Sequence, residues 1–175
     1  MIKLYFEETD NAKAHSEMIC RRILGKYLNT DGDNLIIHKA EFGKPYLRDY
    51  PKVHYNISHT NGVLVCAIAD EPVGVDIENI KSFNRLIVER FFTKSEQDYI
   101  LNNEEDQDER FALIWTKKEA YVKWIGKGLS IPFESFDVLN NNGVPYIYSF
   151  LHDKNCISIC IKESKLIDRC DLLTC

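Results

Sequence analysis

The spacing of apolar residues changes along the chain, and each spacing predicts a different element. Residues 1–6 (MIKLYF) have the apolar and aromatic character of a β-strand. Residues 11–28 carry apolar side chains at helical spacing and follow Asp10, a residue type that caps helix N-termini well. Two later runs, 63–69 and 73–78, are apolar on both faces and are separated by a short turn. Such runs indicate strands at the centre of a sheet.

Helical patterns dominate the middle of the chain. A helix is expected over 82–92, capped by the serine that opens it. A second helix, 93–101, begins with Thr-Lys-Ser-Glu, which is a capping box. A long amphipathic helix is predicted over 109–125 and should end at Gly126. The charged run 102–110 is then a solvated loop between the last two helices.

The tail returns to strand patterns at 136–139, 144–151 and 156–162, with an Asn-Asn-Gly turn between the first two. The chain thus begins with a strand, a helix and further strands, and it continues with a second group of helices and strands. This order predicts an α+β protein with two halves that meet near residue 72, an N-terminal subdomain of residues 1–72 and a C-terminal subdomain of residues 73–175.

Composition narrows the class of protein. The chain has 175 residues, of which 45% are hydrophobic and 28% charged, so it should form a packed core. No apolar run is long enough to span a membrane, and the acidic N-terminus does not resemble a signal peptide. A cytoplasmic protein is therefore expected. The net charge of −5 argues against general binding of nucleic acid, which needs a basic face.

The six cysteines include no Cys-x-x-Cys pair, so the sequence does not predict a zinc site. Cys156 and Cys160 fall on one face of the predicted strand 156–162, opposite three isoleucines. We expect reduced, structural cysteines in a reducing compartment.

The segment Gly-Val-Asp-Ile-Glu at 74–78 holds the first candidate chemistry. On a strand, Asp76 and Glu78 point to the same face about 6–7 Å apart. Neighbouring carboxylates repel each other, so a cation or a hydrogen-bond network is expected to hold them. Hard oxygen ligands of this kind suit Mg²⁺. Two surface acids at the end of a strand are the simpler alternative.

The long helix adds a third carboxylate and a cluster of lysines. Glu119 and Lys123 lie one turn apart, which by itself indicates an ordinary surface ion pair. In a chain that is acidic overall, however, four lysines fall within eleven residues: Lys117, Lys118, Lys123 and Lys127. Carboxylates that hold a metal beside lysines that neutralise oxygens are typical of a polyphosphate site.

Two upstream segments carry further candidates, each of them weak alone. Ser58 and His59 come just before the apolar run 63–69 and place a hydroxyl and an imidazole at the mouth of a strand. Lys44 and Pro45 follow a glycine and combine a cation with a rigid backbone, which suits a planar ring.

Five motifs occur in a fixed order: GKP at 43–45, NISHT at 56–60, GVDIE at 74–78, RFFTKSE at 90–96 and WTKKEAYVKWIGKGLSIPFESF at 115–136. In order and spacing this set resembles the 4′-phosphopantetheinyl transferases of the surfactin-synthetase-activating (Sfp) type. The resemblance implies two similar α+β subdomains that form a pseudo-dimer, with the active site in the cleft between them. Because one chain supplies both halves, a monomer is expected.

The same resemblance implies an activity and a set of site residues. Such enzymes transfer the phosphopantetheine arm of coenzyme A (CoA) to a serine of an apo acyl or peptidyl carrier protein and release 3′,5′-ADP. The implied catalytic residues are Asp76, Glu119 and Lys123, and the implied ligands of Mg²⁺ or Mn²⁺ are Asp76, Glu78 and Glu119. The implied CoA contacts are His15, Lys44, Pro45, Ser58, His59, Lys118 and Lys123. Residues 1–72 would then contact the nucleotide, and residues 73–175 would carry the metal and catalytic motifs.

Carrier domains are generally acidic around the modified serine, so a basic face is expected to receive them. The candidates are Arg85, Arg90, Lys117 and Lys118, together with apolar side chains of the helix 83–92. A solvated basic face without a partner is the alternative.

Two other functions use similar residues. Three carboxylates and a lysine also suit a Mg²⁺-dependent nuclease or phosphodiesterase, although the acidic net charge disfavours nucleic acid. A non-catalytic interaction domain of the same fold is the other alternative, and the complete set of acidic residues argues against it.

The N-terminal region departs from the family pattern. Relatives of this type usually carry basic residues before an Ala-His pair, which help to hold the 3′-phosphate of CoA. Here Ala14 and His15 follow the first strand closely, and Lys13 is the one basic residue just before them. We therefore expect His15 and His59 to be the main contacts to this phosphate, or Arg21 or Arg22 to substitute.

Overall fold

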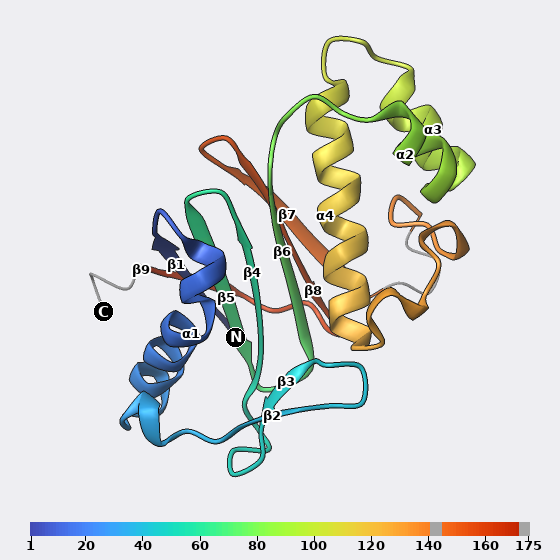
Figure 1. Cartoon of the computed structure of the whole chain (residues 1–175). Coiled ribbons are helices and arrows are strands. Elements are labelled where there is room, and N and C mark those ends of the chain that lie inside the picture. The colour runs from blue at the N-terminus through green and yellow to red at the C-terminus, as the bar shows by residue number, and fades with distance from the viewer. Residues whose placement is uncertain (141–144, 172–175) are drawn as a thin grey trace.

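Two β-sheets pack against each other, and a helix covers the outer face of each, in a computed structural model that describes residues 1–140 and 145–171. Figure 1 shows the two halves side by side, with helix α1 on one sheet and helix α4 on the other. The fold class is α+β, as the sequence predicts.

The first sheet has four strands in the order β4-β5-β1-β9. Their bounds are β1 (Ile2–Glu8), β4 (His54–Thr60), β5 (Val63–Ala69) and β9 (Ile167–Asp171). β5 lies between β4 and β1 and is buried on both faces, as its continuous apolar run predicts. β9 pairs parallel to β1, so a C-terminal strand completes the sheet of the N-terminal half. The outer face of this sheet packs on α1 (Ala12–Leu28).

The second sheet has three antiparallel strands in the order β6-β8-β7. Their bounds are β6 (Val73–Asn79), β7 (Tyr146–His152) and β8 (Asn155–Ile161). The isoleucines of β8 face the first sheet and share one core with apolar residues of β1, β5 and β6. The alternate residues of β8, among them Ser158, face α4 (Gln107–Ile125), where Thr116 hydrogen-bonds the Ser158 hydroxyl. Period-two alternation therefore divides β8 between two cores.

A smaller layer lies outside α4. Helices α2 (Arg85–Phe91) and α3 (Lys94–Leu101) pack there against aromatic residues of α4. A short hairpin, β2 (Ile37–Lys39) and β3 (Pro45–Leu47), lies at the end of the molecule where α4 ends (Figure 1). Three single-turn helices complete the described structure: η1 (Gly32–Asn34), η2 (Gly128–Ser130) and η3 (Phe133–Ser135).

Several predicted boundaries need correction. Asn11, and not Asp10, caps α1, and Asn84 caps α2, which begins later than predicted. The capping box at Thr93 and the end of α4 at Gly126 are confirmed. α4 begins at Gln107, so the end of the charged run is helical.

Strand predictions also need correction. The segment 136–139 is not a strand, β6 is an edge strand of its sheet, and β4 and β9 were missed. The predicted turn at 141–143 lies outside the described residues. The predicted boundary after residue 72 does not account for β9, which belongs to the first sheet.

The four cysteines whose side chains are described (Cys20, Cys66, Cys156 and Cys160) are buried and free, as expected. No described helix is long and apolar enough to cross a membrane.

Candidate active site

Contacts among three polar side chains join the two halves at the edge between β4 and β6. The Lys123 ammonium, from the last turn of α4, lies 2.6 Å from Oδ1 of Asp76 on β6. Ser58 on β4 donates its hydroxyl to the same Oδ1 at 2.7 Å and accepts from Lys123 Nζ at 2.9 Å. Three elements thus bring three predicted site residues together.

Close packing of α4 on β6 makes this contact possible. A Cβ added to Gly74 would lie 2.0 Å from the Ala120 carbonyl oxygen and 2.5 Å from the Trp124 amide. Any side chain at this position would therefore push α4 away from the strand. Because Gly74 and Asp76 share a face of β6, the same approach brings Glu119 and Lys123 beside Asp76.

Side-chain hydrogen bonds connect β4 and β6 along their length. Asn56 Oδ1 accepts from the Val75 amide at 2.8 Å, and Thr60 donates to Asn79 Oδ1 at 3.0 Å. Ser58 makes the third link, to Asp76. These polar side chains of β4 hold the edges of the two sheets in register, so β4 contributes directly to the alignment of the site.

The three carboxylates repel one another in a partly buried cleft. Burial raises the pKa of Glu119, Asp76 and Glu78 raise it further, and Lys123 lowers it. Burial and Asp76 likewise raise the pKa of Glu78, against Lys81 and Lys123. Asp76 is 4% exposed, and its Oδ2 is buried without a hydrogen-bond partner among the described residues. Two lysines beside three carboxylates therefore leave the negative charge of this site incompletely compensated.

These groups line a cleft of about 340 Å³. The lining residues are Ser16, Ile57, Ser58, His59, Asp76, Glu78, Trp115, Glu119 and Lys123. Ser16, Ile57 and Trp115 were not predicted as site residues. Trp115 opens the motif that contains Glu119, whereas nothing in the sequence marks Ser16. His15 lies in α1 next to Ser16 but is exposed and does not line the cleft.

The donor set fits a divalent cation of the Mg²⁺ type. Its oxygens are hard ligands, one of them is an unpaired buried carboxylate oxygen, and their mutual repulsion would be relieved by a cation. Within the described residues, however, no three His, Cys, Asp or Glu side chains are grouped closely enough to form a metal site by themselves. Water molecules or oxygens of a ligand would complete the coordination of an ion held here.

Lys44 and Pro45 lie in a second cleft of about 250 Å³, away from the carboxylates. The Lys44 ammonium donates to three backbone carbonyls, those of Val73 (3.0 Å), Lys123 (2.7 Å) and Trp124 (3.2 Å). Burial lowers the pKa of Lys44 to about 8. Trp124 also borders this cleft, and its buried Nε1 has no partner among the described residues.

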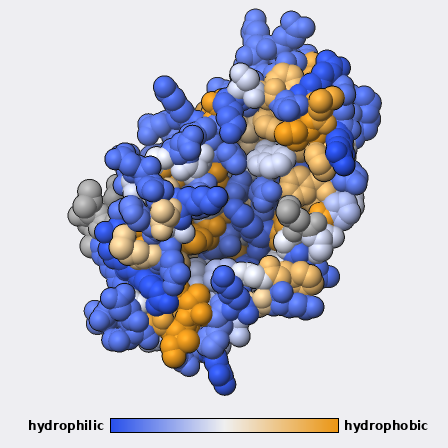
Figure 2. All heavy atoms as spheres, in the orientation of Figure 1, coloured by the Kyte–Doolittle hydropathy of each residue, from blue (hydrophilic) through white to orange (hydrophobic). Residues whose placement is uncertain are grey.

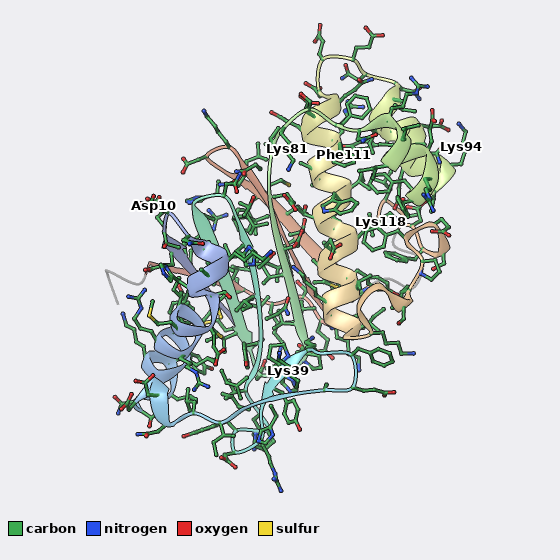
Figure 3. The ribbon with its side chains drawn as sticks, viewed as in Figure 1. Asp10, Lys39, Lys81, Lys94, Phe111 and Lys118 are labelled. Atoms are coloured by element: carbon green, nitrogen blue, oxygen red, sulfur yellow. The ribbon has the colours of Figure 1, made fainter. Side chains whose placement is uncertain are left out.

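The prediction for Lys118 is corrected by the structure. Its side chain is fully buried and forms an ion pair with Glu96 of α3 at 2.8 Å. Its ammonium also donates to the carbonyls of Phe133 (2.7 Å) and Phe136 (2.6 Å). Figure 3 shows Lys118 on the side of α4 that faces α3, away from β6. Lys118 therefore cannot contact a ligand in the cleft or a partner at the surface.

The two arginines proposed as substitutes are engaged elsewhere. Arg21 donates to the Leu35 carbonyl at 2.7 Å, and Arg22 forms an ion pair with Glu7. These contacts tie α1 to its neighbours. Neither arginine lines the cleft that holds His59.

Comparison with known proteins places the chain in a family. Residues 72–173 match the model of the 4′-phosphopantetheinyl transferase superfamily. Among curated proteins, the chain is 39% identical to the 4′-phosphopantetheinyl transferase gsp of Aneurinibacillus migulanus, over 75% of this chain and 55% of that protein. It is 33% identical to the 4′-phosphopantetheinyl transferase Sfp of Bacillus subtilis, over 78% and 61%.

The chain is also 31% identical to the 4′-phosphopantetheinyl transferase psf-1 of Bacillus pumilus, over 91% of this chain and 74% of that protein. It thus spans somewhat more than half the length of the first two relatives and about three quarters of the third. The matched region includes β6 and α4, which supply Asp76, Glu119 and Lys123. The chain therefore belongs to the 4′-phosphopantetheinyl transferase superfamily.

Proposed function

We propose that the chain transfers the 4′-phosphopantetheine arm of CoA to a serine hydroxyl of an apo acyl or peptidyl carrier protein. The observation that carries this proposal is the contact of Asp76, Lys123 and Ser58, beside two carboxylates of raised pKa, in a member of this superfamily. A cation and acidic side chains at one cleft suit a diphosphate substrate. A nuclease or a non-catalytic domain is not favoured.

In this proposal Asp76, Glu78 and Glu119 hold Mg²⁺ or Mn²⁺. Support comes from the donor chemistry, from the unpaired Oδ2 of Asp76 and from the unfavourable repulsion at Glu119. When bound, the ion would neutralise oxygens of the CoA diphosphate.

The chain's own residues then provide charge and proton acceptance. The carrier serine attacks the β-phosphorus of CoA, a new P–O bond forms, and the bond to the α-phosphate oxygen breaks to release 3′,5′-ADP. Lys123 neutralises the charge that develops on the transferred phosphoryl group. Glu119 accepts the serine proton, since its carboxylate lines the same cleft as Asp76 and Lys123.

The nucleotide of CoA is proposed to lie along the N-terminal half. His59 borders the catalytic cleft and would contact the 3′-phosphate, with His15 nearby on α1. Pro45 and the stem of Lys44 would line the adenine site in the second cleft, where Trp124 Nε1 offers an unpaired donor. Ser58 is proposed to reach the ribose end only if its bonds to Asp76 and Lys123 rearrange.

The carrier protein is proposed to dock at the exposed face of α2. Leu86 is 74% exposed there, Phe91 is 38% exposed, and Arg90 lies over the Phe91 ring. Apolar side chains gather in this region, at the upper right of Figure 2. Arg85 adds positive charge, although Glu89 pairs with it. An acidic carrier surface would complement the arginines.

A monomer in the cytoplasm completes the proposal. One chain supplies Ser58 from the first sheet and Asp76 from the second, so a complete cleft needs no second copy. The four free, buried cysteines fit a reducing compartment.

The proposal is tested by incubating the protein with Mg²⁺, CoA labelled on its thiol and a panel of apo carrier domains. We expect the label to appear on at least one carrier, at its modifiable serine. Mutation of that serine to alanine in the carrier is the matched control and should abolish labelling. Failure to label any of a broad set of acyl and peptidyl carriers would contradict the proposed function.

A further inference from the structure

The turn that precedes β3 presents Lys44 to the end of α4. Within this turn the Ala40 amide donates to the Lys44 carbonyl, and the Gly43 amide donates to the Ala40 carbonyl, both at 2.9 Å. Gly43 has φ +84°, a conformation that favours glycine. The backbone of Lys44 is therefore fixed before its side chain leaves the turn.

The Lys44 side chain ends among carbonyls that α4 leaves unpaired. The last carbonyls of a helix lack intrahelical partners, and a cation near them is favourable. Lys44 Nζ satisfies the carbonyls of Lys123 and Trp124 in the last turn and that of Val73 at the start of β6. Since an ammonium has three protons, all of its donors are in use. Its stem lies 3.1 Å from where a Cβ of Gly126 would be, so the helix end is closely packed as well.

Lys123 is therefore fixed both at its backbone carbonyl and at its side-chain ammonium. Its carbonyl accepts from Lys44 at 2.7 Å, and its ammonium donates to Asp76 at 2.6 Å and to Ser58 at 2.9 Å. The start of β6, three residues before Asp76, is held by the same Lys44 ammonium. One cation thus ties the strand of Asp76 to the helix turn of Lys123.

We infer that Lys44 is a positioning residue for the Lys123–Asp76 pair and that its ammonium does not contact the substrate. Lys44 acts through α4: it fixes the last helical turn, and the turn fixes the Lys123 ammonium in the cleft. The catalytic part of this role rests on the proposed function, whereas the structural part does not. The competing account is a direct contact of the Lys44 ammonium with CoA.

The structural role is tested without activity, by hydrogen exchange of the full chain. Lys44→Met keeps the stem and removes the donors, and Lys44→Gln keeps one amide donor. The matched control is Lys39→Met, an exposed lysine on the same hairpin (Figure 3). We expect the amides of residues 123–126 to exchange about tenfold faster in Lys44→Met than in the wild type. The increase should be smaller in Lys44→Gln, and Lys39→Met should exchange at the wild-type rate. A tenfold change corresponds to about 1.4 kcal/mol, near the value of one hydrogen bond to a charged group. Equal exchange in Lys44→Met and Lys39→Met would overturn the inference.

The catalytic role is tested by a double-mutant cycle on transfer. A displaced catalytic group typically costs about a hundredfold, so Lys44→Met should lower kcat/KM by about 10- to 100-fold. In a Lys123→Met background the same change should have almost no further effect, because the residue through which Lys44 acts is gone. If the two losses multiply instead, Lys44 does not act through Lys123 and the inference fails. If the wild-type protein shows no transfer activity, the proposed function is contradicted but the structural role of Lys44 is not. Hydrogen exchange would still decide that structural role.

Discussion

Helix α4 carries two lysine–carboxylate pairs that differ in how completely they are satisfied. In the buried pair, Lys118 and Glu96 are both fully buried and 2.8 Å apart. Lys118 uses its remaining donors on two carbonyls, and Glu96 accepts from the amides of Thr93 and Val138, both at 2.9 Å. This pair joins α3, α4 and the segment that follows η3. Every polar group of the pair has a partner, so nothing is left for a ligand.

The cleft pair, Lys123 and Asp76, is incomplete. The Lys123 side chain is 27% exposed, Asp76 Oδ2 has no partner among the described residues, and Glu78 and Glu119 have raised pKa values beside it. The same residue types thus serve two purposes on one helix. A fully satisfied buried pair fixes a fold, whereas an under-compensated pair at a cleft is prepared for a charged ligand.

The largest difference between the pairs should be in activity. Asp76→Asn removes the carboxylate charge with little change in shape and should lower transfer by more than about a hundredfold, as for the loss of a main electrostatic group. Its thermal stability should change little, because the Lys123 ammonium that loses its partner is 27% exposed and the repulsion of Asp76 with Glu78 and Glu119 is relieved. Initial rates with CoA and a carrier, compared with melting curves, check both statements. Near-normal turnover by this variant would remove Asp76 from the site.

The opposite result is expected for the buried pair. Glu96→Gln leaves the Lys118 ammonium buried without its countercharge and should reduce the free energy of unfolding by about 3–5 kcal/mol. The matched control is Asp98→Asn on the same helix, which breaks the exposed pair with Lys94 and should cost less than about 1 kcal/mol. Urea unfolding measures both. If Glu96→Gln is as stable as Asp98→Asn, the buried pair does not stabilise the fold.

Lys44 is an intermediate case, because it is fully hydrogen-bonded but has no carboxylate partner. The pKa of Lys44 is about 8 in the folded protein and 10.5 in the unfolded chain. Between these values the unfolded chain binds the proton that the folded protein has lost, so this group makes stability rise with pH. At about 1.4 kcal/mol per pKa unit, the rise is about 3 kcal/mol. Two neighbouring groups are coupled to this charge. Cys160 of β8 raises the pKa of Lys44, and Lys44 lowers the pKa of His54 on β4.

The difference in unfolding free energy between wild type and Lys44→Met isolates this contribution above about pH 7, where His54, whose pKa Lys44 lowers, is neutral in both proteins. We expect the wild type to gain relative to the variant from pH 8 to 10.5 and to show almost no relative change from pH 7 to 7.5. A difference that is constant across both ranges would show that the pKa of Lys44 is not lowered.

The smallest expected effect is a gain in stability. Glu119→Gln removes one of the repelling carboxylates and should raise the free energy of unfolding in the absence of metal by about 0.5–2 kcal/mol, as stabilising changes at active sites commonly do. The variant should lose most of any stabilisation by Mg²⁺. Thermal melting with chelator and with Mg²⁺ checks both statements. A wild type that gains nothing from Mg²⁺, even with CoA present, would contradict the metal assignment.

The sequence predicted what local spacing determines. Alternation placed Asp76 and Glu78 on one face of a strand, and helical spacing placed Glu119 and Lys123 on one face of α4. Helix ends with strong caps, such as the box at Thr93, were also predicted correctly.

Long-range contacts were not predictable in the same way. Parallel pairing of β9 with β1 joins segments about 165 residues apart, which no local pattern encodes. Lys118 lies one residue before Glu119 and resembles a site residue, yet its partner comes from α3. Likewise, the three carbonyls around Lys44 come from β6 and α4, and the sequence marks Lys44 only as a cation beside a proline. Partners of this kind are known only once the elements are packed.

Intact-mass spectrometry of an apo carrier protein tests the central claim most directly. The carrier is incubated with CoA and Mg²⁺, and with either the wild-type chain or Lys123→Met. We predict that the wild type adds the mass of one phosphopantetheine per carrier and releases an equal amount of 3′,5′-ADP, and that Lys123→Met leaves the carrier almost entirely unmodified. An equal mass gain with both proteins would contradict the assignment of catalysis to the pair of Lys123 and Asp76.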